Sequence, residues 1–184
     1  LGDVYKRQPK YQALRINPLK TERDTFLLQA PFSLNRVPWT TNGYYYSGND
    51  QPGRHPYHEA GVYYIQEPSA MAPAEYLMAE PGERILDLCA APGGKSSQIA
   101  CSMQGEGLIV CNEIHPARAK ILSENIERMG VCNALVTNET PQKLSDNFRE
   151  YFDRILVDAP CSGEGMFRKN EDACDEWSPE NVEN

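Results

Sequence analysis

The feature that most constrains the fold is the stretch RILDLCAAPGGKSS, which runs from Arg84 to Ser97. It opens with a short apolar run, which is typical of a strand buried on both faces. Pro92, Gly93 and Gly94 then break the run, and Lys-Ser-Ser follows as a suitable helix start. Because glycine has no Cβ, we expect a ligand to approach the main chain closely at this turn, where the first N–H groups of the helix can bind it.

Short apolar strands alternate with helix-length segments from this stretch onward. We expect strands at 85–89, 107–112, 134–137 and 154–158, helices at 95–104 and 116–129, and a polar connection before the last strand. This alternation predicts a mainly parallel sheet with right-handed crossovers, which is a doubly wound α/β domain of the Rossmann-like type. Such sheets normally have further strands, so we expect the domain to be incomplete at its C-terminus.

The segment ahead of this domain has a different character. ALRIN, at 13–17, predicts a strand, and residues 37–64 are rich in Pro, Gly and Tyr, which favours loops and short strands. We therefore assign residues 11–65 to a small α+β region and residues 66–184 to the α/β domain. Residues 1–10 have no usable periodicity, and we leave them unassigned as candidates for non-native sequence.

The tyrosines of the N-terminal region allow two interpretations. Together with Arg54, His55 and His58 they could stack on unpaired bases, or they could form a hairpin packed on the next domain. Pro56 lies between the two histidines and argues against a helix there. A short amphipathic helix is expected at 70–80, with Ala70, Ala74, Leu77 and Met78 on one face.

Charge is unevenly distributed along the chain, whose net charge is −8. Residues 1–60 have 8 Lys and Arg against 5 Asp and Glu, whereas residues 61–184 have 10 against 21. The basic first part could meet a phosphate backbone in spite of the overall negative charge, or it could be ordinary solvated surface.

Cysteine spacing and hydropathy exclude several classes of protein. The six cysteines show neither a CxxC nor a paired metal-ligand spacing, so we expect no metal site and mostly buried thiols in a reduced compartment. No apolar run approaches the roughly 20 residues of a membrane span. We expect a cytoplasmic, monomeric protein without membrane contact.

Two ligand classes use a strand, a glycine turn and a helix. Gly94-Lys95-Ser96 resembles the end of a phosphate-binding P-loop, but the position of the first P-loop glycine is Cys89. This difference disfavours a nucleoside triphosphatase. A ligand with an adenosine ribose instead requires an acidic residue roughly 20 residues farther on, at the end of the second strand, and Glu113 occupies that place.

The turn also lacks the full GxGxxG of dinucleotide enzymes, so S-adenosylmethionine fits better than a pyrophosphate-bridged cofactor. Asn138 ends the third strand and could reach the adenine edge. Asp158 ends the fourth strand and faces the crevice in which open α/β sheets bind ligands.

Asp158 is followed by Ala-Pro-Cys-Ser-Gly, which places the thiol of Cys161 on a proline turn near the expected cofactor. Methylation of a pyrimidine at C5 needs such a thiol, because C5 is a poor nucleophile. Attack of a thiolate at C6 makes C5 nucleophilic, and loss of the C5 proton by β-elimination later releases product and cysteine.

These stretches resemble a known family. LDLCAAPGGKSSQIA, Glu113, VTNETPQKL and ILVDAPCSGEGMFRKN are together similar to the RNA cytosine-5 methyltransferases of the NOL1/NOP2/sun group, and most of all to bacterial members that act on 16S ribosomal RNA. ALRINPLK, VPWTTNGYYY and HPYHEAGVYYIQEPSAMAPA are similar to the N-terminal region of that family. The resemblance implies a class I methyltransferase fold, S-adenosylmethionine as cofactor, and structured RNA, in particular ribosomal RNA or the small ribosomal subunit, as partner.

The resemblance also implies roles for individual residues. The cofactor loop would consist of Cys89, Ala90, Ala91, Pro92, Gly93, Gly94 and Lys95. Glu113 would hold the ribose, Asn138 would lie by the adenine, and Asp158 would contact both the cofactor and the target cytosine. Many relatives have Asp where this chain has Asn138, which keeps an acceptor but loses the charge.

One departure from the family concerns the nucleophile. The attacking cysteine of the family lies in a Thr-Cys motif farther along the chain, whereas the Pro-Cys cysteine, here Cys161, assists product release. No Thr-Cys occurs in these 184 residues. We therefore expect that this stretch alone does not complete the reaction.

Two alternatives remain open on the sequence. DNA cytosine methyltransferases use the Pro-Cys cysteine as nucleophile, and Glu180-Asn181-Val182 reproduces their Glu-Asn-Val tripeptide, although in an acidic tail soon after Cys161. The chain could also be an RNA-binding protein that keeps the fold without activity. In the RNA interpretation the target cytosine must be unstacked, which favours loops and junctions of structured RNA.

Overall fold

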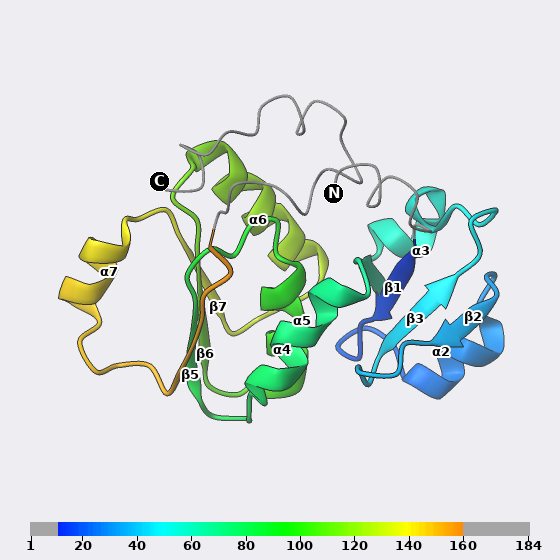
Figure 1. The fold of residues 1–184 in the computed structure, drawn as a ribbon, viewed down its shortest axis with the longest axis horizontal. Coiled ribbons are helices and arrows are strands. Elements are labelled where there is room, and N and C mark those ends of the chain that lie inside the picture. The colour runs from blue at the N-terminus through cyan, green and yellow to red at the C-terminus, as the bar shows by residue number, and fades with distance from the viewer. Residues whose placement is uncertain (1–10, 160–184) are drawn as a thin grey trace, which may run out of the picture. The chain divides into compact units, whose positions relative to one another are not determined.

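The structure is a computed structural model that describes residues 11–159. These residues contain two four-stranded sheets, one antiparallel and one parallel (Figure 1). The sheets follow one another in the sequence, in agreement with the predicted α+β region ahead of an α/β domain. No helix among the described residues is long and apolar enough to cross a membrane.

The antiparallel sheet has the strand order β2-β3-β1-β4. Its strands are β1 (Ala13–Ile16), β2 (Leu34–Arg36), β3 (Gly43–Tyr46) and β4 (Tyr63–Ile65), and helix α2 (Arg23–Gln29) lies between the first two in sequence. Side chains alternate across β1, so Leu14 and Ile16 join an apolar cluster with Phe26 of α2. Arg15 faces the opposite way, toward the second half of the chain.

Two short helices, η1 (Pro52–Arg54) and α3 (Pro56–Glu59), connect β3 to β4. The expectation that Pro56 prevents a helix at the two histidines was therefore wrong. Proline has no N–H to donate, but the first residue of a helix needs none, and Pro56 occupies that position. His55 caps the helix, because its Nδ1 accepts a hydrogen bond from the Tyr57 amide at 3.2 Å.

The parallel sheet has the strand order β7-β6-β5-β8. Its strands are β5 (Arg84–Asp87), β6 (Leu108–Asn112), β7 (Ala134–Thr137) and β8 (Arg154–Leu156), and its helices are η2 (Ser69–Met71), α4 (Ala72–Leu77), α5 (Gly94–Met103), α6 (Pro116–Arg128) and α7 (Pro141–Asn147). Figure 1 shows α4, α5 and α6 on one side of the sheet and α7 on the other. The predicted Rossmann-like arrangement is confirmed.

An apolar core lies on each face of the parallel sheet. Ile85, Ile109 and Leu122 belong to the larger core, on the side of α5 and α6. Leu86 and Val110 pack with Leu144 of α7 on the other face. Because both faces of β5 and β6 are covered, their sequences are continuous apolar runs rather than alternating ones.

The order of the strands positions the site. From β5 the chain proceeds to β6 and then β7 on one side, and then returns to β8 on the other side of β5. A crevice forms where the strand order reverses in this way, outside the carboxyl ends of the strands. The turn after β5 and the residues after β8 both lie at this point.

Two local features differ from the expectations. Helix α7 lies in the expected polar connection, where its sequence PQKLSDN contributes only Leu144 to the core. Met78 does not extend the apolar face of α4, because it follows the helix in a left-handed conformation (φ 51°) and is 66% exposed. Ala74 is buried on α4 as expected.

Candidate functional site

The turn between β5 and α5 is built from main-chain contacts. Gly93 N–H donates to the Ala90 carbonyl at 2.8 Å, and Ser97 N–H donates to the Gly93 carbonyl at 2.9 Å as the helix begins. Ala90 N–H donates to the Asn112 carbonyl at 2.8 Å, which ties the turn to the end of β6. The amides at the start of α5 have no partners within the helix and are available to a ligand.

The two glycines of the turn serve a purpose that the sequence did not indicate. Gly93 has a φ of +107°, and a Cβ there would lie 3.2 Å from the Leu122 side chain of α6. At Gly94 a Cβ would lie 3.2 Å from the Tyr64 ring of β4. Side chains of α6 and β4 therefore lie close to the main chain at these two positions.

Asp87, the last residue of β5, was not among the predicted site residues, although its place in the strand supported the prediction of S-adenosylmethionine. It is 1% exposed, and its Oδ2 accepts a hydrogen bond from the Ser96 hydroxyl at 2.7 Å. Its Oδ1 is buried without a hydrogen-bond partner among the described residues. Burial raises the pKa of Asp87 to about 6, against the opposing effect of the Ser96 hydrogen bond.

Glu113 lies just beyond β6, and its carboxylate is connected to the turn. Its Oε1 accepts from the His115 amide at 3.0 Å, and its Oε2 forms an ion pair with Arg118 at 3.3 Å. Arg118 also donates to the Ala91 carbonyl at 3.1 Å, so it bridges Glu113 and the turn. Asn138 lies beside them, because its side-chain amide donates to the Glu113 carbonyl at 2.6 Å.

Lys95 and Asp158 are joined directly. The distance from Lys95 Nζ to Asp158 Oδ2 is 2.6 Å, and Lys95 is the less exposed partner. This ion pair links the first turn of α5 to the segment that follows β8, across the point where the strand order reverses. The structure thus brings Asp158 to the turn, as the sequence predicted. Cys161 lies outside the described residues.

Asn112 is a second buried residue that sequence reasoning missed. Its Oδ1 accepts from the Thr137 hydroxyl at 2.9 Å, and its Nδ2 donates to the Leu88 carbonyl at 3.2 Å. One side chain therefore fixes the ends of β5, β6 and β7 relative to each other. A polar residue at the end of an otherwise apolar strand was the available signal.

The electrostatics of the site distinguish between the candidate ligands. The carboxylates of Asp87, Glu113 and Asp158 lie close enough together that all three, after burial itself, raise the pKa of the Cys89 thiol. S-adenosylmethionine carries sulfonium and ammonium cations and a ribose diol, which suit such a set. A triphosphate would be repelled, and Lys95 already pairs with a carboxylate. The residues fit S-adenosylmethionine and do not support the P-loop alternative.

Three of the four cysteines of the described segment, Cys89, Cys101 and Cys111, are poorly suited to nucleophilic chemistry. Burial raises the pKa of the Cys111 thiol to about 12 and also raises that of Cys101. Cys89, in the turn, also has a raised pKa. All three are therefore thiols at neutral pH, whereas attack requires a thiolate.

Residues 74–184, more than half of the chain, match the protein family described as 16S rRNA methyltransferase RsmB/F. The chain belongs to this family. Residues 2–68 match a second family, the N-terminal domain of 16S rRNA methyltransferase RsmF. This second match begins within the segment that the sequence left unassigned, and the resemblance to RNA methyltransferases is confirmed.

Individual RsmB/F relatives agree with this membership. Ribosomal RNA small subunit methyltransferase F of Vibrio vulnificus strain YJ016 is 41% identical over 97% of this chain and 40% of the relative. The protein of the same name from Escherichia coli O157:H7 is 40% identical over 95% of this chain and 38% of the relative. The chain thus spans about 40% of the length of these curated relatives.

Solved structures share the RsmB/F fold. A methyltransferase homolog protein from Pyrococcus horikoshii is 32% identical, with a TM-score of 0.80 over 92% of this chain and 56% of that chain. NSun6 from Pyrococcus horikoshii, solved with SFG, is 18% identical, with a TM-score of 0.81 over 99% of this chain and 70% of that chain. The second likeness is evidence for the fold alone.

Proposed function

We propose that this chain contains the S-adenosylmethionine site and an RNA-contacting region of an enzyme that methylates cytosine at C5 in 16S ribosomal RNA. The observation that carries the proposal is the convergence of the turn after β5 with the carboxylates of Asp87, Glu113 and Asp158 at one edge of the parallel sheet. Membership of the RsmB/F family and the names of its relatives support the rRNA substrate.

Each carboxylate has a distinct part in the proposed cofactor site. Glu113, held by Arg118, binds the ribose hydroxyls, and Asn138 lies next to it by the adenine. We assign the amino-acid part to the amides at the start of α5 and to the buried Asp87 carboxylate beneath them, one oxygen of which has no partner among the described residues. The cofactor supplies an electrophilic methyl group on a sulfonium. The residues after β8 present the target cytosine to that methyl group.

Asp158 and Cys161 are the proposed catalytic residues of this stretch. Asp158 is anchored by Lys95 beside the turn, where it can hydrogen-bond the cytosine. A thiolate adds to C6 of the base, the methyl group is transferred to C5, and loss of the C5 proton expels the thiolate. In the family pattern the cysteine that attacks C6 lies in a downstream Thr-Cys motif. Cys161 instead assists the β-elimination that releases the product.

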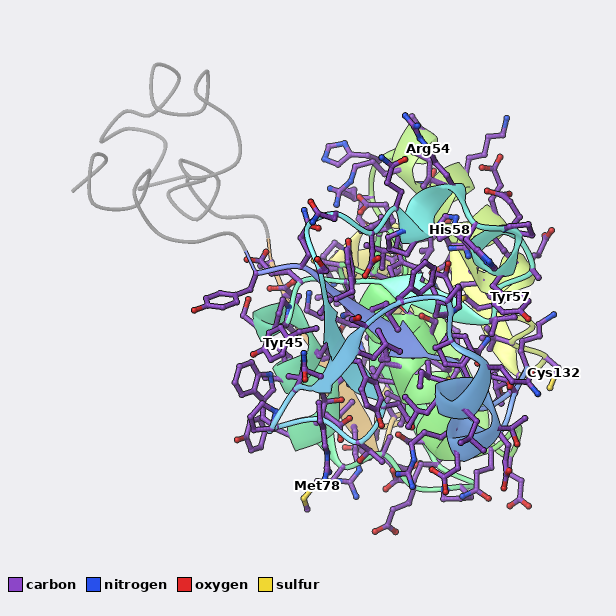
Figure 2. All side chains as sticks on the ribbon, turned by 90° about the vertical axis from the view of Figure 1, so that its right-hand side faces the viewer. Tyr45, Arg54, Tyr57, His58, Met78 and Cys132 are labelled. Atoms are coloured by element: carbon purple, nitrogen blue, oxygen red, sulfur yellow. The ribbon has the colours of Figure 1, made fainter. Side chains whose placement is uncertain are left out.

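We assign residues 11–65 to RNA contact and residues 66–184 to the methyltransferase domain. Three of the six tyrosines between residues 37 and 64 pack inside the molecule, since Tyr44, Tyr63 and Tyr64 are buried. Other aromatic side chains remain available to bases, including Tyr11, 65% exposed, and Trp39, 40% exposed. Figure 2 shows Arg54 and His58 on the side of the molecule that faces the viewer, where the exposed Arg54 could meet a phosphate.

Calorimetric titration of the folded chain with S-adenosylmethionine and, separately, with ATP tests the cofactor site. We expect binding of S-adenosylmethionine and none of ATP, because the site is acidic. A folded chain that binds neither ligand would favour an RNA-binding module without activity. Binding of ATP alone would overturn the proposal.

A Cys161→Ala variant of the natural full-length protein tests the substrate and the role of this thiol. With 16S ribosomal RNA and S-adenosylmethionine, we expect a covalent protein–RNA adduct to accumulate on a denaturing gel, because elimination is impaired. The unchanged protein should release 5-methylcytosine-containing RNA, measured by mass spectrometry. Covalent capture of DNA by the unchanged protein, lost in the variant, would instead establish the DNA alternative.

A further inference from the structure

The turn between β5 and α5, which forms the proposed cofactor site, accepts hydrogen bonds from side chains of other elements. Arg118 of α6 donates to the Ala91 carbonyl at 3.1 Å. Asn125, also on α6, donates to the Pro92 carbonyl at 2.9 Å. Because the Ala91 and Pro92 carbonyls are hydrogen-bonded to α6, we infer that the amides at the start of α5 point away from α6, toward the ligand. The precision of the turn thus depends on its supports.

Part of this support comes from the antiparallel sheet. Arg15 of β1 donates from Nη2 to the Gly94 carbonyl at 3.1 Å and to the Ser97 hydroxyl at 2.7 Å. These groups belong to the first turn of α5, some eighty positions later in the chain. The guanidinium is held in this orientation from the sheet side, because its Nε donates to Gln66 Oε1 at 3.1 Å.

Arg15 has an environment that is unusual for a residue with only a packing role. It is 1% exposed, and no carboxylate forms an ion pair with it among residues 11–159. Burial lowers the pKa of this arginine, because charge is unfavourable in the interior. An apolar residue of similar length would avoid that cost. A buried arginine at this position is explained if its guanidinium N–H groups are needed to orient the start of α5.

Tyr64 of β4 provides a second support from the same sheet. Its hydroxyl donates to the Pro92 carbonyl at 3.4 Å, and its ring lies against Gly94. The ring is flanked by two guanidinium groups, those of Arg15 at 5.9 Å and Arg128 at 5.7 Å from the ring centroid. Such cation–π contacts fix the plane of the ring and hence the direction of its hydroxyl.

We propose that Arg15 and Tyr64 are positioning residues for the cofactor turn, so that the antiparallel sheet sets the affinity for S-adenosylmethionine as well as contacting RNA. This inference rests on the proposed function of the turn. It predicts that damage to these two contacts weakens cofactor binding in protein that is still folded. Damage to the other face of the same sheet should change stability only.

The experiment compares Arg15→Met and Tyr64→Phe with a matched control, Leu14→Ala. Leu14 adjoins Arg15 on β1 but is buried in the apolar cluster on the opposite face of the sheet. Calorimetry gives the dissociation constant for S-adenosylmethionine at a temperature at which circular dichroism shows each variant to be folded. We expect Arg15→Met to raise this constant about tenfold or more, because misplaced binding groups are costly.

Tyr64→Phe removes one long hydrogen bond and should raise the constant by about threefold. The Leu14→Ala control should stay within about twofold of the unchanged chain even though its melting temperature falls. If Arg15→Met does not fold, Tyr64→Phe decides the question alone. In steady-state assays of the natural full-length protein, KM for S-adenosylmethionine should rise in Tyr64→Phe, whereas KM for RNA should not.

Several outcomes would overturn the inference. Folded Arg15→Met, or folded Tyr64→Phe, with unchanged affinity for S-adenosylmethionine would show that the contacts serve packing alone. An equal loss of affinity in Leu14→Ala would show that any destabilisation has the same effect. If the unchanged chain does not bind S-adenosylmethionine, the proposed function itself fails, and the two failures are thereby distinguished.

Discussion

Asp87 is the residue whose ionisation links folding to ligand binding. Its pKa is raised from 3.8 to about 6 in the folded chain, chiefly by burial. Between these two values the folded state binds a proton that the unfolded state has lost. The contribution of Asp87 to the free energy of unfolding therefore falls as pH rises from about 4 to about 6, and it is constant above that range.

We expect Asp87→Asn to remove this dependence. Relative to the unchanged chain, the variant should gain up to roughly 3 kcal/mol in the free energy of unfolding between pH 4 and pH 7, in addition to any constant difference. Urea unfolding of both chains at a series of pH values measures the difference. Parallel pH profiles for the two chains would contradict a buried, ionising Asp87.

Ionisation of Asp87 should have the opposite effect on ligand binding: it lowers the free energy of unfolding but should raise the affinity for the cofactor. Ionised Asp87 attracts a cationic cofactor, so affinity for S-adenosylmethionine should decline as pH falls below about 6. Asp87→Asn should bind the cofactor weakly and without this decline. Calorimetry at pH 5 and pH 8 tests the prediction, and a decline retained in the variant would assign the titration to another group.

Arg118 is a half-exposed residue whose loss we expect to affect both cofactor binding and stability, because its partner Glu113 is buried. Its side chain is 48% exposed, yet it bridges Glu113 and the Ala91 carbonyl. Arg118→Met should also lower the free energy of unfolding by more than about 1 kcal/mol, because it leaves the Glu113 carboxylate, whose side chain is 3% exposed, without its ion-pair partner. It should weaken S-adenosylmethionine binding about tenfold, because Glu113 and the turn lose their connection.

Lys120→Met is the matched control for Arg118→Met. Lys120 lies on the same helix with 80% of its side chain exposed, and its one ion pair with residues 11–159 is with Glu124 at 4.0 Å. Calorimetry and urea unfolding of both variants provide the comparison. Equal cofactor affinity in the two variants would contradict the proposed bridge.

Among the helices, α7 shows how a polar segment is organised by one cap and one buried side chain. The Thr140 hydroxyl accepts a hydrogen bond from the Lys143 amide at 3.3 Å, and Leu144 packs against the sheet. Thr140→Ala should lower the free energy of unfolding by about 1 kcal/mol, the usual cost of losing an N-cap. Gln142→Ala, at an exposed position on the same helix, should cost about 0.5 kcal/mol or less in urea unfolding.

The sequence predicts the parallel sheet well because its strands are buried on both faces. The predicted strand at 134–137 matches β7, and Pro116 and Gly130 flank α6 as helix-end preferences require. Helix α7 was missed because a single buried leucine gives no periodicity. Helix α3 was missed because proline was counted against the helix rather than as its first residue.

The sequence predicted the acidic residues Glu113 and Asp158 of the site, but not the residues that hold the turn in place. Glu113 and Asp158 follow apolar strands, so their positions at the sheet edge follow from strand direction alone. Arg15 and Tyr64 meet the turn only through the tertiary structure, and no local pattern connects them to Gly94. The contact of Gly94 with the Tyr64 ring could not be predicted for the same reason, because that ring comes from β4.

Several hydrogen bonds join the antiparallel sheet to the parallel-sheet domain. The Asn17 side-chain amide is within 2.8 Å of both the Gly61 and the Met129 carbonyls, which joins the end of β1 to the end of α6. Arg128 adds a hydrogen bond at 2.7 Å to the His58 carbonyl. We therefore expect both sheets to lose their structure together, rather than in two separate transitions.

Gly61 and Gly82 offer a matched test of this connection. Both have positive φ, +69° and +86°, so alanine strains the backbone at either position by about 1–2 kcal/mol. A Cβ at Gly82 would meet nothing within 4 Å, whereas a Cβ at Gly61 would overlap the Arg128 carbonyl. Gly61→Ala should therefore cost at least about 2 kcal/mol more than Gly82→Ala in urea unfolding.

Hydrogen exchange would show where the additional cost of Gly61→Ala arises. Protection should fall together in β1 and in the last turn of α6, because the substitution pushes the two apart, and it should be unchanged at both places in Gly82→Ala. A loss confined to β1 would mean that the antiparallel sheet opens by itself. In that case the sheet could not position the cofactor turn through Arg15, since the support would open independently of the turn it holds.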